Sequence, residues 1–329
     1  MTRVALDLPL GTLIQGWPRI AAFLDGLGLT GLPPDRSVRE WLADLPDARL
    51  HDMGLDREQL AAHLRHLTDS TAEVTSETIQ TVTIHGGRGK SGDSDSADLV
   101  VRAGEIVCVV GPTGSGKSRL LADVECLAQG DTPSGRRILL NGAAPTAAQR
   151  FAPGCKLVAQ ISQNMNFVVD LTVGAFLATH ARCRQVHRQD DVVERVVAVA
   201  NTLAGERFGP DVSVTQLSGG QARALMIADA ALLTASPIIL IDEIENAGIN
   251  RRQALDLLVA EDKIVLVSTH DPLLALLGHR RVIVRHGRVA DVLATSDREK
   301  TVLQRLEGID ARIAGLRNRL RHGERVDDV

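Results

Sequence analysis

Apolar positions along the chain follow three successive patterns, which predict short helices, then alternating strands and helices, and finally one long helix. In the first region, residues 1–72, apolar residues recur three and four positions apart, as in Val38, Trp41 and Leu45. Ser37, directly before this run, is a residue type that caps helix N-termini. The first pattern therefore predicts a small all-α domain over residues 1–72.

Residues 73–295 carry short continuous apolar runs separated by glycine-rich and polar segments, a pattern typical of buried strands. The runs that predict strands are residues 73–85, 99–102, 106–110, 137–141, 156–162, 238–243 and 264–268. Helical spacing follows the third run and returns at residues 222–233. The alternation of buried strands with helices predicts an α/β domain over residues 73–295.

In the last region, residues 296–329, apolar residues alternate spacings of four and three. These residues are Val302, Leu306, Ile309, Ile313, Leu316 and Leu320. Such a heptad seam predicts a coiled-coil-like helical tail, although a seam this short is marginal as a free coiled coil. Two interpretations stay equal: the helix packs back on the α/β domain, or it forms a helical hairpin or a dimer contact.

Composition and charge describe an ordinary soluble protein and disfavour several classes of function. The net charge is -4 and aromatic residues make up 2% of the chain, so neither a general nucleic-acid surface nor many base-stacking platforms are expected. No apolar run approaches the roughly 20 residues that span a bilayer. The four cysteines lie far apart and lack paired spacing. We expect a cytoplasmic protein with reduced thiols and no membrane span of its own.

The strand at residues 106–110 leads into a glycine-rich loop and then into a helix. The loop reads Gly111-Pro112-Thr113-Gly114-Ser115-Gly116-Lys117-Ser118, which is the P-loop spelling G-x-x-x-x-G-K-[ST]. Its backbone N–H groups converge on phosphate oxygens, and the helix N-terminus adds partial positive charge. We expect Lys117 to reach the β- and γ-phosphates and Ser118 to bind Mg²⁺. The nucleotide-binding candidates are Gly111, Thr113, Gly114, Ser115, Gly116, Lys117 and Ser118.

Two later strands end in polar side chains suited to a metal-assisted reaction. The apolar residues 238–241 are followed by Asp242 and Glu243. A buried strand that ends in paired acids is expected to face a cation or a reacting water. Asp242 is the candidate ligand of Mg²⁺, and Glu243 is a catalytic candidate beside it. The strand at residues 264–268 runs similarly into His270, a further catalytic candidate.

These motifs, together with Leu217-Ser218-Gly219-Gly220-Gln221, resemble the ATP-binding cassette (ABC) ATPases over about two-thirds of the chain and in the same order. The resemblance implies a nucleotide-binding domain with a helical subdomain, ATP and Mg²⁺ as its ligands, and a head-to-tail homodimer. It gives Glu243 the role of the catalytic glutamate, the general base for the attacking water, and His270 the role of the switch histidine. The signature residues Ser218, Gly219, Gly220 and Gln221 would then bind the γ-phosphate of ATP held by the opposing subunit.

The resemblance also implies a Q-loop glutamine that takes part in catalysis and in Mg²⁺ binding. Gln163 follows the strand at residues 156–162 and precedes Asp170-Leu171-Thr172-Val173 at the family's spacing. Gln160 is the rival assignment. Gln163 is favoured because it falls at the end of the strand.

The sequence departs from the usual family pattern in two places within the cassette. Ile244 stands where proline usually follows the catalytic glutamate, and Ile249 lies where an aspartate is expected in the loop that crosses to the other subunit. No aromatic residue between Glu73 and Gly104 is available to stack on adenine. His85, Arg88 and Lys90 are the remaining planar or cationic substitutes.

The N-terminal helical region bears on which partner the ATPase serves. Residues 16–29 resemble a small helical domain found in redox and iron–sulfur-repair proteins, although a packing or docking module without chemistry is favoured. Together with the departures above, the added region slightly favours a soluble ATPase that remodels or activates a partner such as a soluble enzyme. The alternative is the ATP-binding subunit of a membrane transporter, peripheral to the inner membrane. A DNA-maintenance ATPase is disfavoured, because no long coiled-coil insertion interrupts the cassette.

Overall fold

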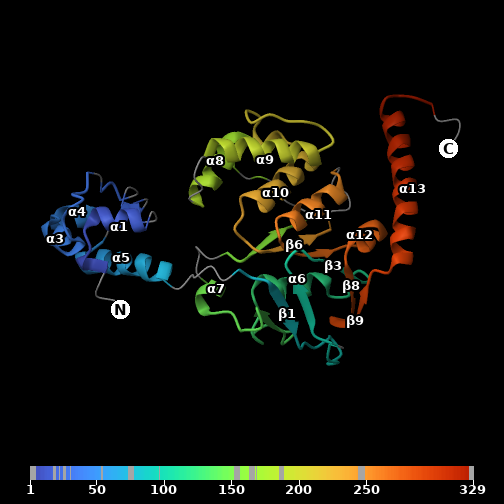
Figure 1. Cartoon of the computed structure of the whole chain (residues 1–329), viewed down its shortest axis with the longest axis horizontal. Helices are drawn as coiled ribbons and strands as arrows, with labels where there is room; N and C mark the ends of the chain where they lie inside the picture. Colours follow the sequence, from blue (N-terminus) through green and yellow to red (C-terminus); the bar gives the residue numbers. More distant parts are fainter. Residues whose placement is uncertain are drawn as a thin grey trace. The chain divides into compact units, whose positions relative to one another are not determined.

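The computed structural model divides the chain into two compact units, Met1–Glu77 and Thr78–Val329, each of which is described by itself (Figure 1). The described residues are 5–17, 20–21, 23–24, 27–29, 31–52, 55–72, 78–95, 97–151, 156–162, 167, 169–184, 189–243 and 249–325. The domain boundary that the sequence predicts after residue 72 adjoins residues 73–77, which lie outside this set.

The first unit is built from short helices around one apolar core. Its elements are η1 (Ala5–Asp7), α1 (Leu10–Gly16), α3 (Val38–Asp44), α4 (Asp47–Asp52) and α5 (Arg57–Ala72). The predicted cap at Ser37 is confirmed: its Oγ accepts the backbone N–H of Glu40 at 3.3 Å, and its own N–H donates to the Glu40 carboxylate. Trp41 is 8% exposed and Trp17 packs against the same core, so both tryptophans contribute to the interior of the unit.

The second unit holds two sheets. The antiparallel sheet has the order β2-β1-β4, with β1 Thr81–His85, β2 Leu99–Arg102 and β4 Arg137–Leu140. The larger sheet has the order β5-β6-β7-β3-β8-β9 and is parallel except for the last pair. Its strands are β3 Ile106–Val110, β5 Val158–Ile161, β6 Ile238–Asp242, β7 Ile264–Ser268, β8 Arg280–Arg285 and β9 Arg288–Ala294. The α/β architecture predicted from the sequence is confirmed.

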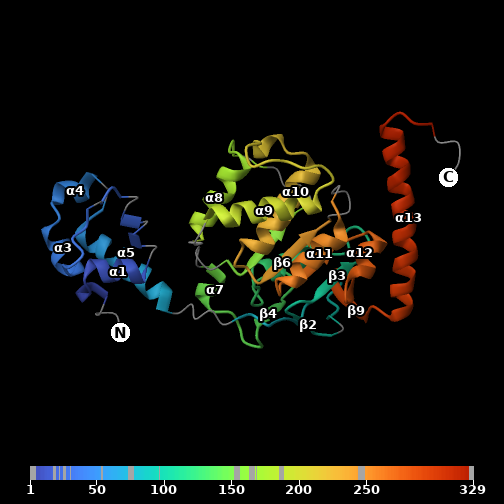
Figure 2. The same ribbon diagram turned by 45° about the horizontal axis from the view of Figure 1, so that its top comes forward.

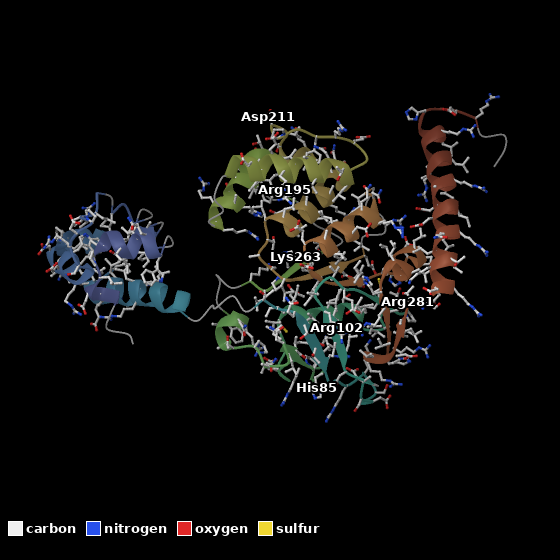
Figure 3. All side chains as sticks on the ribbon, in the orientation of Figure 1. His85, Arg102, Arg195, Asp211, Lys263 and Arg281 are labelled. Atoms are coloured by element: carbon white, nitrogen blue, oxygen red, sulfur yellow. The ribbon has the colours of Figure 1, made fainter. Side chains whose placement is uncertain are left out.

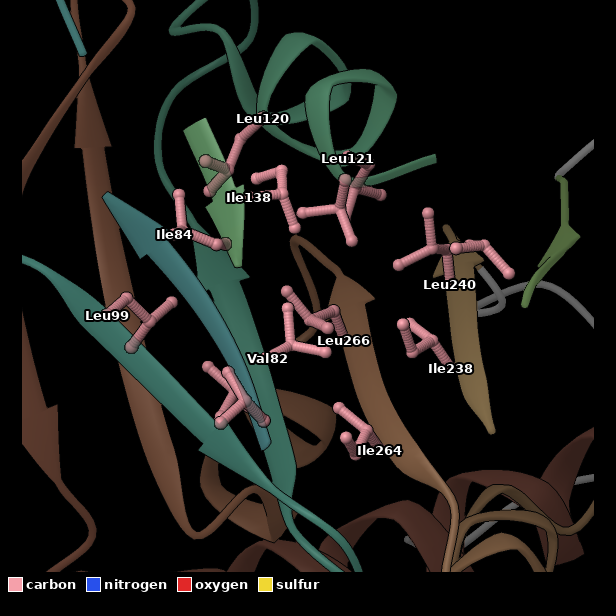
Figure 4. Packing of buried hydrophobic residues seen from close by; sticks show 14 of the residues in the cluster. Val82, Ile84, Leu99, Leu120, Leu121, Ile138, Ile238, Leu240, Ile264 and Leu266 are labelled. Carbon is pink, nitrogen blue, oxygen red and sulfur yellow. The ribbon is translucent and has the colours of Figure 1, made fainter. Parts of the chain in front are cut away.

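Residues of the central strands alternate between two cores, which explains their continuous apolar runs. Ile238 and Leu240 of β6 join the core between the two sheets, where Val82, Leu120 and Ile138 also lie (Figure 4). Ile239 and Ile241 of the same strand face α10, α11 and α12 instead. The sheet is therefore buried on both faces, and the carboxyl ends of β3, β6 and β7 meet at one edge.

Helices of the second unit cover the larger sheet, and three of them, α8, α9 and α10, form a helical subdomain (Figures 1 and 2). The helices of this unit are α6 Lys117–Glu125, α7 Ala147–Phe151, α8 Val173–Cys183, α9 Gln189–Leu203, η2 Val214–Gln216, α10 Gly219–Leu232, α11 Arg251–Ala260, α12 Pro272–Leu277 and α13 Asp297–Arg321. Helices α8, α9 and α10 share a separate apolar core, and α13 packs beside α12. Within the described residues, no helix is both long enough and apolar enough to cross a bilayer.

One predicted strand is wrong in its length. The sequence predicts a strand over residues 73–85, but β1 begins only at Thr81. Before β1, the Asn141 side chain accepts the backbone N–H of Gln80 at 2.8 Å and that of Thr81 at 3.1 Å. These bonds take the place of ladder bonds, so residues 78–80 do not extend the sheet, while residues 73–77 of the predicted strand lie outside the described residues.

Candidate nucleotide-binding site

The glycine-rich loop joins β3 to α6 and lies against the tip of the β8–β9 hairpin. At this tip the backbone N–H of Gly287 donates to the Ser115 carbonyl at 2.6 Å. A Cβ on Gly116 would lie 2.8 Å from the Gly287 Cα, and a Cβ on Gly111 would lie 2.3 Å from the Val284 carbonyl oxygen. Glycine is therefore required at both ends of the loop, because the hairpin supports it from behind.

Lys117 begins α6 and is only 6% exposed. Its Nζ donates to the Gly111 carbonyl at 3.0 Å and to the Pro112 carbonyl at 3.4 Å. The ammonium is thus held over the loop, and Ser115 Oγ lies buried there without a hydrogen-bond partner in the described part of the chain. Both groups fit a loop that receives phosphate oxygens.

A cavity of about 620 Å³ lies over the loop. The charged side chains in its described lining are Arg88, Lys90, Lys117 and Arg119, against the single carboxylate of Glu243. A cleft lined mainly by one sign of charge concentrates ligands of the opposite sign. The cavity is therefore suited to a polyanion such as a nucleoside triphosphate.

Glu243 and His270 meet at the carboxyl edge of the sheet, as the sequence predicts. Glu243 follows β6 in a left-handed conformation, with a φ of 50°, and its backbone N–H donates to the Ser268 carbonyl at 3.0 Å. Its Oε1 lies 2.9 Å from His270 Nε2, and Lys117 Nζ lies 3.2 Å from the same nitrogen. The ammonium can only donate and the carboxylate can only accept, so Nε2 hydrogen-bonds to Lys117 in one tautomer of His270 and to Glu243 in the other. The candidate base, the histidine and the P-loop lysine thus converge at one wall of the cavity.

Asp242 and Ser118 are the two described residues that the sequence predicts as ligands of Mg²⁺. Asp242 is the last residue of β6, and the exposed Ser118 follows Lys117 at the start of α6. Among the described residues, no cluster of three or more His, Cys, Asp or Glu side chains could hold a metal. A carboxylate and a hydroxyl still fit Mg²⁺, which is commonly bound by few protein ligands together with substrate phosphates and water.

The signature residues cap α10. Ser218 Oγ accepts the backbone N–H of Gln221 at 3.3 Å, and Gln221 Oε1 accepts that of Ser218 at 2.9 Å. This reciprocal box starts the helix at Gly219, earlier than the predicted residue 222. Ser218 and Gly219 are exposed, and residues 218–221 are not part of the described lining of the cavity. The structure therefore does not bring the signature to the P-loop of its own chain.

Two predicted parts of the site cannot be placed. Gln163 lies outside the described residues, as do residues 244–248 of the loop after Glu243. The rival glutamine, Gln160, lies within β5, and its amide nitrogen donates to both carboxylate oxygens of Glu125 at 2.9 and 3.1 Å when oriented to satisfy both groups. Gln163 as the Q-loop residue stays a prediction.

Sequence reasoning missed a buried ion network behind the loop. The guanidinium of Arg136, a residue that is 0% exposed, donates to the carboxylates of Asp95 and Asp123 at 3.0 Å and to the Gly287 carbonyl at 2.8 Å. Burial alone would lower the pKa of Arg136, but hydrogen bonds and charges from the two aspartates hold that pKa above its usual value. The network connects the residue 86–98 loop, α6 and the hairpin tip.

The three residues proposed to replace the adenine-stacking aromatic lie at or beside the cavity. Arg88 and Lys90 line it, and Lys90 Nζ also donates to the Gly114 carbonyl at 3.2 Å. His85 lines a neighbouring cavity of about 460 Å³, and Figure 3 labels it at the antiparallel sheet. Its Nδ1 lies 2.6 Å from Asp98, and this hydrogen bond lowers the pKa of the Asp98 carboxyl. Cationic side chains, not aromatic ones, therefore dominate this end of the site.

This lining predicts loose recognition of the base. GTP is expected to compete within about tenfold of ATP, a difference of about 1.4 kcal/mol. The reason is that no described lining residue offers a Phe or Trp ring for stacking on adenine. A competition titration of a fluorescent ATP analogue with ATP and GTP measures the ratio, with Lys117→Ala as the control that should weaken both nucleotides together. A preference for ATP above a hundredfold would contradict the prediction.

Comparison with known proteins gives one family. The model of the ABC transporter family matches residues 95–246. An uncharacterized ABC transporter ATP-binding protein of Methanocaldococcus jannaschii is 48% identical over 249 residues, which are 75% of this chain and 95% of that protein. The cobalamin import ATP-binding protein BtuD of Halobacterium salinarum is 31% identical over 209 residues, covering 60% of this chain but only half of that protein.

Solved structures agree on the fold. The structure of an ATP-binding subunit of an ABC transporter superposes with a TM-score of 0.52 at 22% identity, covering 68% of this chain and 94% of that one. Because the identity is low, this likeness concerns the arrangement of strands and helices alone.

Proposed function

The chain belongs to the ATP-binding cassette (ABC) family and hydrolyses ATP, and we propose that it does so as the ATP-binding subunit of a membrane transporter. This proposal rests on the M. jannaschii relative. The chain matches 95% of that relative's length, and the relative's name describes the ATP-binding protein of an ABC transporter. The relatives thus favour the alternative over the soluble remodelling ATPase that the sequence slightly favours. In this proposal the chain is peripheral to the cytoplasmic face of the membrane.

Two cassettes are proposed to pair head to tail and form two composite sites. Each site joins Lys117, Glu243 and His270 of one subunit to Ser218 and Gly220 of the other. The N-terminus of α10 supports this arrangement, because its exposed Ser218 and Gly219 lie where a helix attracts phosphate. That helix end also lies outside the described cavity of its own chain, so a second chain is needed to complete the site.

The chemistry proposed for the site is hydrolysis by an activated water. Glu243 Oε1 is placed to accept the proton of the water, and His270 Nε2, 2.9 Å from that oxygen, lies beside it in the site. Lys117 supplies a fixed positive charge for the phosphates. Mg²⁺, held by Ser118 and Asp242 with Gln163 as a further proposed ligand, would neutralise charge on the transferred phosphoryl group.

A membrane partner requires a docking surface, and exposed apolar side chains flank the predicted Q-loop. Leu171 is 37% exposed and Val169 is 40% exposed. In contrast, Thr172 Oγ1 caps α8 at 3.2 Å from the Ala175 nitrogen, and Val173 is fully buried. Within Leu171-Thr172-Val173, the exposed apolar side chain that a partner could contact is therefore Leu171. Val169 adds a second one.

Purification from membranes tests the proposal. We expect the tagged protein, extracted from membranes in mild detergent, to retain a polytopic membrane protein. The double variant Val169→Asp/Leu171→Asp should lose this protein while its ATP hydrolysis stays within about twofold, since neither residue contacts the cavity in the described structure. Leu293→Asp, at a residue of β9 that is 40% exposed, is the matched control and should retain it.

Two results would contradict the transporter interpretation. One is recovery of a soluble enzyme whose binding requires residues 1–77. The other is a membrane protein that the double variant retains as well as the Leu293→Asp control does.

A further inference from the structure

Helix α13 presents an inner and an outer side to its surroundings. On the inner side Leu303 is 5% exposed, Glu307 pairs with Arg252 at 3.3 Å, and Asp310 pairs with Arg251 at 2.8 Å. Near the start of the helix, Glu299 pairs with Arg281, which Figure 3 labels near the lower end of α13. The first half of α13 therefore packs on the cassette. This agrees with the interpretation that the tail helix packs back on the α/β domain.

The outer side carries apolar residues of the heptad seam, and Val302 of the seam, near the start of the helix, is 45% exposed as well. Ile309 is 52% exposed, Ile313 40% and Leu320 60%, while Leu316 is partly buried. In Figures 1 and 2 the ribbon of α12 lies beside the lower part of α13, whereas the upper part extends past the neighbouring helices. These four side chains thus form an apolar row from residue 309 to residue 320, along the second half of the helix.

Arginines follow one edge of this row. Arg298, Arg305, Arg312 and Arg319 lie seven residues apart and so share one stripe of the helix. Arg305 and Arg312 are exposed, and Arg319 pairs with Glu324 of the tail at 3.0 Å. Charge is therefore segregated on α13: carboxylates at 299, 307 and 310 pair with the cassette, while the stripe of arginines borders the exposed row.

We propose that the outer face of α13, formed by Ile309, Ile313, Leu316 and Leu320 with Arg305, Arg312 and Arg319 beside them, docks one amphipathic helix of a partner protein. That helix carries Asp or Glu next to its own apolar seam. Residues that flank the a and d positions of a coiled coil select the partner by charge, and three arginines on one flank select an acidic one.

Two other occupants fit the outer face less well. In a parallel pair of α13 helices Arg312 would face Arg317 of the second copy, and Arg305 would face Asp310, which already pairs with Arg251 of its own chain. In an antiparallel pair the arginine stripe would face itself, so unfavourable like-charge contacts arise in both pairings. A helix that lies in a membrane interface has a wide apolar face rich in Trp, Phe and Leu. Residues 297–321 contain no aromatic residue, and the exposed row is a narrow seam.

Binding of two matched probes to the full chain tests the proposal. The probes are synthetic helices about three heptads long with Leu and Ile at the seam and either Glu or Lys at the flanks. By fluorescence anisotropy at low salt, the Glu probe is expected to bind with a dissociation constant of about 10–100 μM and at least ~10-fold more tightly than the Lys probe. The preference should shrink at high salt.

Variants separate the contributions of charge and seam. Arg305→Glu/Arg312→Glu/Arg319→Glu should reverse the preference of the chain for the Glu probe, and Ile309→Ser/Ile313→Ser should abolish binding of both probes. As a control for total charge, the same change at the exposed Arg102, Arg137 and Arg285 should leave the preference unchanged. Equal binding of the two probes, or binding of neither, would overturn the proposal.

Two further measurements test the other occupants directly. Sedimentation equilibrium without nucleotide should give a monomer; a dimer that Ile309→Ser/Ile313→Ser dissociates would assign the face to a second copy. Flotation should leave the chain apart from phosphatidylserine vesicles; co-flotation that the same double variant abolishes would assign the face to a membrane. Either of these results would overturn the acidic-helix proposal.

Discussion

Glu243→Gln is expected to lower the rate of ATP hydrolysis by about 10²–10⁴-fold while ATP binding is retained. The amide has the shape of the carboxylate but cannot accept the proton of an attacking water. The backbone contact from Glu243 to the Ser268 carbonyl is unchanged by the substitution, as are the lysine and the loop that receive the phosphates. The Glu243→Gln protein should therefore bind ATP as the wild type does but hydrolyse it far more slowly.

Phosphate release and nucleotide binding, measured on the same preparation, test this separation. Asp256→Asn is the matched control, because Asp256 is an exposed carboxylate on α11 and the described cavity does not include it. It should hydrolyse ATP at the wild-type rate. The Glu243→Gln protein, in contrast, should accumulate as an ATP-bound dimer in size-exclusion chromatography, because ATP closes the proposed composite site and only hydrolysis opens it. Hydrolysis by Glu243→Gln at the rate of the control would remove Glu243 from the role of base.

The parts of the site that the sequence predicts well are those where a strand ends in an unusual residue. Asp242 and Glu243 follow four apolar residues, and in a parallel sheet the carboxyl ends of neighbouring strands meet at one edge. The contact between Glu243 and His270 could therefore be expected before any coordinates, although these residues are 27 positions apart. The P-loop is predictable for a similar reason, because its glycines leave room for the hairpin that packs against them.

Other features depend on packing that no local pattern specifies. Glu243 adopts a left-handed conformation, and its backbone N–H bonds to the Ser268 carbonyl of β7, the strand that pairs with β6; no residue pattern around Glu243 indicates this conformation. The heptad seam of the tail left two interpretations equal: packing on the α/β domain, or a hairpin or dimer contact. The spacing of apolar residues does not indicate which turns of a helix contact another element. The ion pairs of Glu307 and Asp310, two residues outside the seam, hold the first half of α13 on the cassette, while Val302 of the seam is exposed.

The buried network was missed although a signal for it was present. Ile138 and Leu140 of β4 both face the core, and the two-residue period of a strand places Arg136 on the same side. A guanidinium in that position requires buried carboxylates, since an isolated charge is too costly to bury. Asp95 and Asp123 come from a loop and a helix, and the sequence does not indicate that either would reach β4.

Arg136→Met is expected to destabilise the protein by about 3–5 kcal/mol, because it leaves two buried aspartates without their counter-charge. Asp95 and Asp123 have side chains that are 4% and 1% exposed, so water cannot replace the guanidinium. For a unit of this size the loss corresponds to a fall of about 6–20 °C in the melting temperature. Differential scanning fluorimetry of the full chain measures it.

Arg137→Met is the matched control, since Arg137 is the exposed neighbour of Arg136 and its loss should cost about 0.5 kcal/mol or less. Adding Asp95→Asn and Asp123→Asn to Arg136→Met should recover part of the stability, because the buried charges then disappear with their partner. That recovery distinguishes an uncompensated charge from a simple loss of packing. If Arg136→Met melts within about 1 °C of Arg137→Met, the ion network does not stabilise the fold, and the hairpin contacts alone hold the P-loop in place.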